Sequence, residues 1–154
     1  MYDYMNGLIT DVRPDGIVLE VNNIGYFINV SNPYTFEINK MSRVYLYQQV
    51  KEDELNLFGF KKKEEKELFL KLINVKGLGC KMALPILATG SINGIMEAIE
   101  RENIAYLKKF PKIGDKLARQ MILDLKGKIG SVHTLFDDNS INSVSYTHLR
   151  AHET

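Results

Sequence analysis

The spacing of apolar residues along the chain changes its period once, near residue 61. Before that point, apolar and polar positions alternate in short runs, as expected of strands with one buried face. Asp15-Gly16 and Asn22-Asn23 are turn signals between such runs, and Gly25 suggests a bulge or barrel bend. The runs cover residues 8–12, 17–21, 24–30, 44–48 and 55–60. Five or six short strands with tight turns predict a small Greek-key barrel of the OB type.

Helical spacing takes over after K-K-K-E-E-K-E at residues 61–67. Apolar stripes follow at 68–73, 92–99 and 117–125, with Ser91 placed as an N-cap and Gly127 and Gly130 after the last stripe. This pattern predicts four or five short helices between residues 61 and 129. The fold class expected is α+β with several domains: the barrel over 1–61, an all-α domain over 62–130, and a linker and tail over 131–154.

The helical part contains an internal repeat at an offset of 35 residues. The segments 72–87 and 107–122 each contain a predicted helix, a short glycine hairpin and a second predicted helix. The matching pairs are Gly79 with Gly114, Lys81 with Lys116, Ala83 with Ala118, and Leu78 with Ile113. Two such copies predict a pair of helix-hairpin-helix motifs.

The first copy, N-V-K-G-L-G-C-K-M-A-L, contains a G-x-G that could approach either a dinucleotide or a DNA phosphate. A dinucleotide fingerprint needs a preceding strand and a third glycine, but the preceding segment has helical spacing and Met82 occupies the third position. A phosphate would be bound by free backbone amides at the start of the next helix and by a lysine charge. If the glycines only turned the chain, the lysine shared by both copies would have no explanation. We therefore favour phosphate binding.

Charge is distributed unevenly along the chain, although the net charge is only +1. Counting Lys and Arg against Asp and Glu gives about −4 for residues 1–60, +7 for 61–130 and −2 for 131–154. A basic middle segment favours an anionic partner. Charge alone is equally compatible with a solvated, lysine-rich surface.

Several functional classes lack support in the sequence. No apolar run approaches the roughly 20 residues of a membrane span, and the N-terminus lacks the features of a signal peptide. The single cysteine, Cys80, excludes an internal disulfide framework, which favours a cytoplasmic location, and it has no catalytic companion. No Walker A sequence and no carboxylate cluster of the metal-binding type occurs. We therefore predict no catalytic residue, no metal and no cofactor.

A family resemblance is carried by several segments together. They are V-N-N-I-G-Y-F-I-N-V, V-K-E-D-E-L-N-L-F-G-F, L-F-L-K-L-I-N-V-K-G-L-G-C-K-M-A-L and A-I-E-R-E-N-I-A-Y-L-K-K-F-P-K-I-G-D-K-L-A. Over residues 1–130 the chain resembles the RuvA family of Holliday junction binding subunits. The resemblance implies a non-catalytic homotetramer, or an octamer on DNA, that holds a four-way junction open during recombination, repair and the SOS response. The implied partners are the RuvB motor, which drives branch migration with ATP, and the RuvC resolvase.

The resemblance also implies roles for particular residues. An acidic pin that repels phosphates at the junction centre would consist of Glu52 and Asp53. The residues expected to bind DNA phosphates are Gly77, Gly79, Lys81, Lys112, Gly114, Lys116 and Arg119.

The second copy departs from the family pattern at three positions. Lys112 replaces the usual glycine, Asp115 replaces a common basic residue, and Arg119 lies one position earlier than usual. Asp115 should weaken phosphate contact locally, and Lys112 should offset part of that loss. The first copy is therefore the better candidate for phosphate binding.

The C-terminal segment is expected to differ from the family. D-D-N-S-I-N-S is interpreted as the start of a linker, and S-Y-T-H-L-R-A-H-E-T as a non-native tail. His148 and His152 have a spacing that would suit a metal on a helix, but a disordered tail is the favoured interpretation. A third domain that would bind RuvB is absent from the sequence, which predicts weakened or lost motor binding.

Two functions of other classes remain open. The paired helical motifs could form a protein-interaction module, or they could serve as an accessory domain of a nuclease.

Overall fold

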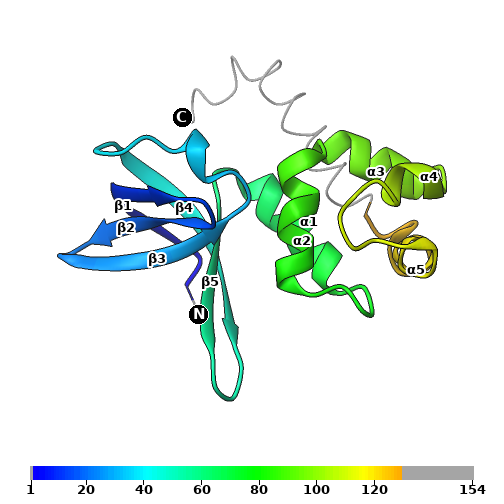
Figure 1. Ribbon diagram of the computed structural model, residues 1–154, viewed down its shortest axis with the longest axis horizontal. Helices are drawn as coiled ribbons and strands as arrows, with labels where there is room; N and C mark the ends of the chain where they lie inside the picture. Colours follow the sequence, from blue (N-terminus) through cyan, green and yellow to red (C-terminus); the bar gives the residue numbers. More distant parts are fainter. Residues whose placement is uncertain (1, 130–154) are drawn as a thin grey trace, which may run out of the picture.

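The computed structural model describes residues 2–129, and Figure 1 shows a strand-rich part followed by a helical part. The predictions for Gly130, for the linker and tail, and for His148 and His152 fall outside the described residues. The strands are β1 (Tyr4–Arg13), β2 (Gly16–Val21), β3 (Ile24–Val30), β4 (Met41–Val50) and β5 (Leu55–Phe60), with a short 3-10 helix, η1 (Pro33–Thr35). The helices are α1 (Lys63–Ile73), α2 (Cys80–Thr89), α3 (Ile92–Glu100), α4 (Ile104–Leu107) and α5 (Asp115–Leu125).

The strands close into a barrel in the order β1-β2-β3-β5-β4, which confirms the predicted OB-like architecture. Asn22 and Asn23 have φ values of 52° and 66°, as the tight β2–β3 turn requires. Of the bulge or barrel bend suggested at Gly25, the bulge is wrong, because the β2–β3 register runs regularly through this residue. The register shift lies in β1 instead, between Ile9 and Asp11.

Strand β5 contributes to both hydrophobic cores of the molecule. On one side of β5, Leu57 packs with the barrel core, which contains Ile17, Leu19, Ile28, Val44 and Leu46. On the other side, Phe58 and Phe60 belong to the helical core. Their rings lie 5.6 and 4.8 Å from that of Phe69 in α1. The barrel and α1 are therefore joined by continuous aromatic packing as well as by the chain.

Helix α3 begins and helix α5 ends where their sequence signals predict. Ser91 accepts a hydrogen bond from the Gly94 amide at 2.9 Å, which confirms it as the N-cap of α3. Gly127, after α5, has a φ of +83°, typical of a residue that ends a helix. Within residues 2–129 there are five α-helices, in agreement with the four or five expected.

No single helix within residues 2–129 is long and apolar enough to cross a membrane. Helices α2 and α3 pass that test only when taken together, and they are bent by 107° relative to each other.

Candidate nucleic-acid interface

The two glycine hairpins have the same backbone conformation. We call residues 74–79, between α1 and α2, the first hairpin, and residues 109–114, between α4 and α5, the second hairpin. The Leu78 amide donates to the Val75 carbonyl at 3.0 Å, and the Ile113 amide donates to the Phe110 carbonyl at 3.2 Å. All four of these side chains are buried. The internal repeat is therefore a structural repeat, held in shape by matching buried positions.

Lys112 adopts the left-handed conformation of its counterpart in the first hairpin. Gly77 has a φ of +90° and Lys112 a φ of +65°. This conformation costs a residue with a Cβ about 1–2 kcal/mol. The second hairpin thus keeps the turn while carrying a lysine at a position that favours glycine.

Gly79 and Gly114, in contrast, are not required by the backbone. They are the N-caps of α2 and α5, with φ values of −92° and −94° that any residue adopts. Within residues 2–129, and apart from the glycine and its chain neighbours, a Cβ built on either position would meet no heavy atom within 4 Å. Neither packing nor backbone strain therefore explains why both positions are glycine. The absence of a Cβ leaves the free amides at the start of each helix open to a close-approaching anion.

The two hairpins lie next to each other and share one recess. Its volume is about 510 Å³, and its lining includes Gly77 from the first hairpin and Gly114 from the second. A Cβ on Gly77 would lie 3.7 Å from Leu117 Cδ1 in α5. The remaining lining residues are Lys76, Lys116, Leu117 and Gln120. Of the predicted phosphate-binding residues, Gly77, Gly114 and Lys116 thus line one recess, whereas Lys81 lines a different cleft.

Asp124 holds the first hairpin against α5, a role that the sequence analysis missed. Its carboxylate accepts a hydrogen bond from the Lys76 amide at 3.1 Å and another from Gln120 Nε2 at 2.9 Å. These hydrogen bonds lower the pKa of Asp124, that from Gln120 contributing most. The only sequence signal is an acidic residue on the polar side of an amphipathic helix, which would not have identified its partner 48 residues away.

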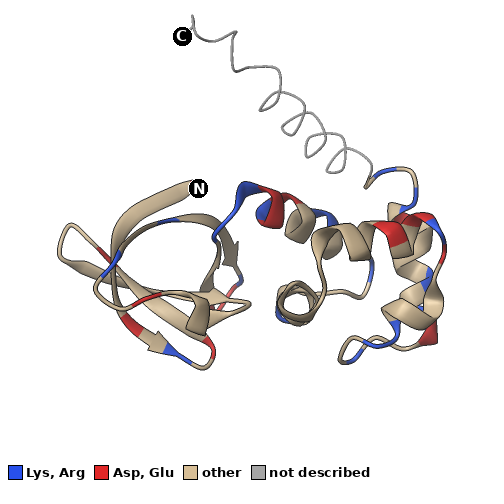
Figure 2. Cartoon of the chain, turned by 90° about the horizontal axis from the view of Figure 1, so that it is seen from above, with Lys and Arg blue, Asp and Glu red and all other residues tan. Residues whose placement is uncertain are grey.

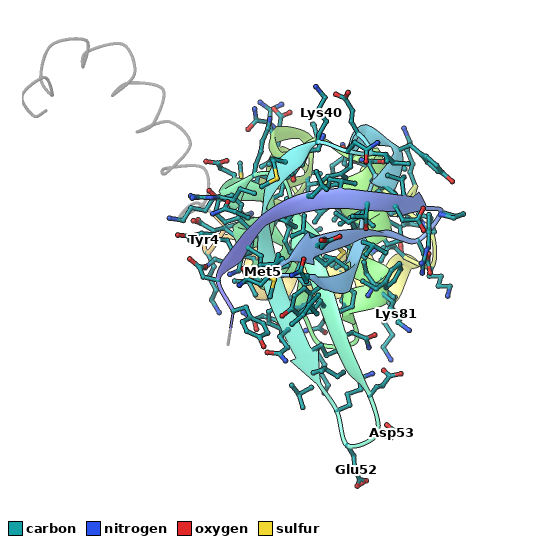
Figure 3. The ribbon with its side chains drawn as sticks, turned by 90° about the vertical axis from the view of Figure 1, so that its left-hand side faces the viewer. Tyr4, Met5, Lys40, Glu52, Asp53 and Lys81 are labelled. Atoms are coloured by element: carbon teal, nitrogen blue, oxygen red, sulfur yellow. The ribbon has the colours of Figure 1, made fainter. Side chains whose placement is uncertain are left out.

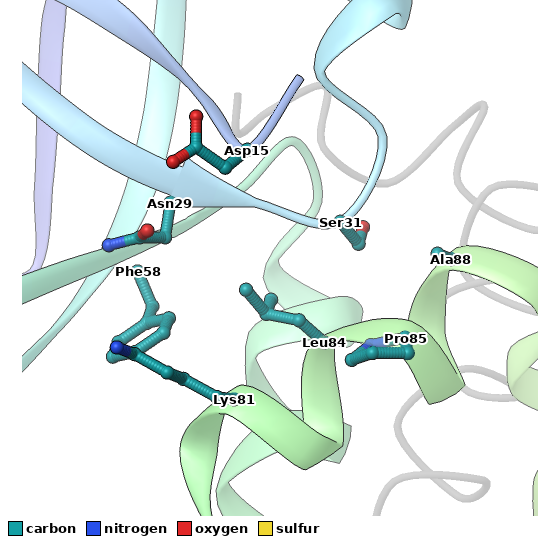
Figure 4. A pocket seen from close by; sticks show the side chains of 8 residues that line it. All are labelled: Asp15, Asn29, Ser31, Phe58, Lys81, Leu84, Pro85 and Ala88. Atoms are coloured by element: carbon teal, nitrogen blue, oxygen red, sulfur yellow. The ribbon is translucent and has the colours of Figure 1, made fainter. Parts of the chain in front are cut away.

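Lys81 lies on the side of α2 that faces the barrel. It lines a cleft of about 470 Å³ together with Asp15, Asn29 and Ser31 of the barrel (Figure 4). Its side chain is exposed and, within residues 2–129, forms no ion pair or hydrogen bond. The ammonium group is therefore available to an external anion.

Cys80, beside Lys81, is buried. Burial raises the pKa of its thiol. The neutral thiol adds no charge to the start of α2.

The second hairpin carries its own anion. Asp115, the first residue of α5, accepts a hydrogen bond from Arg119 Nε at 2.9 Å and has Lys108 Nζ 3.7 Å away. The hydrogen bond from Arg119, followed by its charge, lowers the pKa of Asp115. Arg119, predicted as a phosphate ligand, is therefore paired within the protein. Figure 2 shows this mixture of basic and acidic segments in the helical part.

The predicted acidic pin lies at the end of a projecting hairpin, which we define as residues 49–56 of β4, β5 and their connection (Figures 1 and 3). Glu52 and Asp53, the acidic tip, are exposed, and their carboxylates have no partner within residues 2–129. Lys51 and Glu54 pair with each other at 3.7 Å just below the tip. Figure 3 places Lys81 on the same side of the molecule as this hairpin and Lys40 at the opposite end.

Comparisons with known proteins agree with this arrangement. The model of the RuvA N-terminal domain matches residues 1–59, and that of the SAM-like helix-hairpin-helix tandem matches residues 69–128. A Pediococcus pentosaceus protein is 51% identical over 140 residues, which are 89% of this chain and 72% of that protein. The chain belongs to the RuvA family.

Two further RuvA relatives show similar identity. Proteins of Streptococcus sanguinis and Streptococcus pneumoniae are 50% and 49% identical over 131 residues, or 84% of this chain. The aligned part covers 67% and 66% of those relatives. All three relatives are named Holliday junction branch migration complex subunit RuvA.

Within residues 2–129 there is no group of three or more His, Cys, Asp or Glu side chains placed to bind a metal ion.

Proposed function

We propose that this RuvA-family chain is a non-catalytic subunit that binds four-way DNA junctions and holds them open for branch migration in recombination and DNA repair. The observation that carries the proposal is the pair of matching helix starts at Gly79 and Gly114. Each presents free amides under an open surface, and neither glycine is explained by the fold.

Phosphate binding at these helix starts follows from their electrostatics. Amides not used within a helix point outward from its N-terminus, and the helix dipole adds a partial positive charge there. Lys81 and Lys116 contribute a full charge two positions after each glycine. Such contacts hold the DNA backbone without reading base sequence, as a subunit that acts on any junction requires.

The acidic tip supplies selectivity for junction shape. On linear duplex, the two unpaired carboxylates of the tip would make no favourable contact with the DNA. At a strand crossover, they repel phosphates that would otherwise approach one another. Two unit charges 4 Å apart interact by about 1 kcal/mol in water and about 4 kcal/mol at an effective dielectric of 20. Several tips at one crossover would therefore disfavour a stacked, closed centre.

The assembly is proposed by family resemblance. Four copies would surround one junction, or eight would enclose it, and the RuvB motor and the RuvC resolvase are the partners that the family implies. We propose a cytoplasmic location and participation in the SOS response on the same basis.

The decisive experiment compares the affinity of the chain for a synthetic four-way junction and for a linear duplex of the same length, by gel shift over a salt series. We expect much tighter binding to the junction and a slope of log affinity against log salt near −0.9 for each phosphate contacted. Equal affinity for the two DNAs would refute the proposal.

The double variant Glu52→Gln/Asp53→Asn tests the role of the tip. We expect it to bind duplex at least as well as wild type while losing part of the preference for the junction. Mass measurement with and without the junction tests the proposed tetramer and octamer in the same samples.

A further inference from the structure

The projecting hairpin carries an exposed apolar pair directly behind its acidic tip. Val50 and Leu55 oppose each other across the β4–β5 ladder, with 70% and 63% of their surfaces exposed. Within residues 2–129, no other two exposed large apolar residues face each other across a strand pair. Their placement at the far end of the hairpin keeps them outside both hydrophobic cores.

The two faces of this hairpin differ in chemistry. Val50 and Leu55 continue the alternation that, nearer the body, points Leu46 and Leu57 into the barrel. The opposite face carries Gln49 and Asn56, which continue the alternation of residues packed toward the helices. The hairpin therefore has one apolar and one polar face, with the carboxylates at their common end.

We propose that Val50 and Leu55 form a surface that receives the faces of unpaired nucleobases at the junction centre. This inference rests on the proposed junction binding and adds a second role for the hairpin. The carboxylates exclude phosphates from the tip and can accept hydrogen bonds at the edges of bases, but they offer no apolar contact to the faces of bases that lose their pairing partners. An aliphatic surface beside the carboxylates supplies that contact.

Charge excludes negatively charged groups from this surface. A ligand that lies against Val50 and Leu55 comes close to Glu52 and Asp53, so negatively charged groups are repelled. The unpaired Lys81, on the same side of the molecule, would hold a phosphate backbone and leave the uncharged base faces to meet the hairpin. Aliphatic side chains inserted at base steps in other DNA-binding proteins are known to unstack bases in this way.

The pair has a competing structural explanation, because cross-strand apolar pairs also stabilise hairpins. Threonine separates the two roles. It has a high strand propensity and pairs well with a second threonine across strands, but it presents less apolar surface. The test variant is therefore Val50→Thr/Leu55→Thr. The matched control is Ile24→Thr, since Ile24 is 54% exposed beside the β2–β3 turn.

The experiment uses the full chain and a four-way junction with 2-aminopurine at the crossover, where loss of stacking raises fluorescence. We expect wild type and Ile24→Thr to raise the fluorescence equally and the double variant to raise it much less. Affinity for the junction should fall about tenfold, because burial of one aliphatic side chain typically contributes at least that factor. The salt slope should stay unchanged, since no phosphate contact is removed.

Three results would overturn the inference. The double variant could produce the full fluorescence increase, or Ile24→Thr could reduce it equally. The double variant could also change the mass of the protein without DNA, in which case the pair contacts a second copy of the chain. If wild type itself showed no preference for the junction, the proposed function would fail rather than this inference alone.

The single variants Val50→Thr and Leu55→Thr are used in place of the double variant if thermal unfolding shows that the double variant does not fold.

Discussion

In the first hairpin, the helix start at Gly79 is followed by the buried, neutral Cys80 and then by Lys81, whose charge has no partner among the described residues. In the second hairpin, the helix start at Gly114 is followed by Asp115, which already binds Arg119. The backbones are matched, yet one helix start is open to a phosphate while the other is next to a carboxylate. The shape of the motif and its capacity to bind an anion are thus separate properties.

There is a physical reason why the shape of the motif and its capacity to bind an anion are separate. The shape depends on buried residues such as Leu78 and Ile113, which must fill the same space in both copies. Anion binding depends on exposed residues such as Lys81 and Asp115, which packing does not constrain. A sequence can therefore keep the hairpin fold at both sites while it changes the ligand preference of one.

The largest expected effect is at Lys81. Lys81→Glu should lower junction affinity at least tenfold, because a charge-assisted hydrogen bond contributes about 1.5–3 kcal/mol. The same change at Lys116 should lower it less, since Asp115 already opposes phosphate there. Gel shift measures the junction affinity of both variants. Lys40→Glu, at the opposite end of the molecule, is the control and should leave affinity nearly unchanged. Equal losses at Lys81 and Lys116 would remove the proposed difference between the hairpins.

Gly79→Ala should weaken junction binding about tenfold while leaving stability within about 0.5 kcal/mol, the usual range for surface changes. Among the described residues beyond its chain neighbours, the added Cβ meets no heavy atom within 4 Å, but it occupies the space above the helix amides. Gly114→Ala should have the same small effect on stability and a weaker effect on binding. Thermal unfolding measures the stability of both variants, and gel shift on the same samples measures their junction affinity. A large loss of stability in Gly79→Ala would show that the glycine is structural.

Exchanging residues at the left-handed position should change stability in opposite directions. Lys112→Gly should raise the free energy of unfolding by about 1 kcal/mol, and Gly77→Lys should lower it by a similar amount, because only glycine adopts this conformation without a steric cost. Denaturant unfolding measures both values. If Lys112→Gly left the protein equally stable, the φ of +65° would carry no measurable strain.

The smallest expected effect is at Asp115. Asp115→Asn should strengthen junction binding a few-fold and steepen the salt dependence, because Arg119 is released for phosphate contact. The Lys116→Gln variant is the control and should change the slope in the opposite direction. Unchanged affinity in Asp115→Asn would mean that Arg119 does not reach DNA.

The ion pair between Asp115 and Arg119 also predicts how the stability of the protein depends on pH. The pKa of Asp115 is lowered below its ordinary value of 3.8 in the folded protein. Its stabilising contribution is therefore present above that value and is lost as the pH falls through the lower, folded pKa. Thermal unfolding of wild type and Asp115→Asn should differ at neutral pH and converge at strongly acidic pH.

Local patterns predicted most of the elements correctly. Alternation located the strands, helical spacing located α1, α3 and α5, and Ser91 marked a helix start. The bulge expected at Gly25 was wrong, because a glycine in a strand also occurs where the register is regular. The domain boundaries, the phosphate-binding residues and the acidic pin stay predictions, since they concern independent folding units and a ligand.

The sequence by itself determined the order of strands and helices and the repeat of the hairpins, because both follow from contacts between near neighbours. Only the tertiary structure decided that β5 serves two cores, that the two hairpins share a recess, and that Asp124 holds the Lys76 amide. It also decided that Arg119 is paired while Lys81 is available. These features depend on how distant segments pack, which periodicity along the chain does not specify.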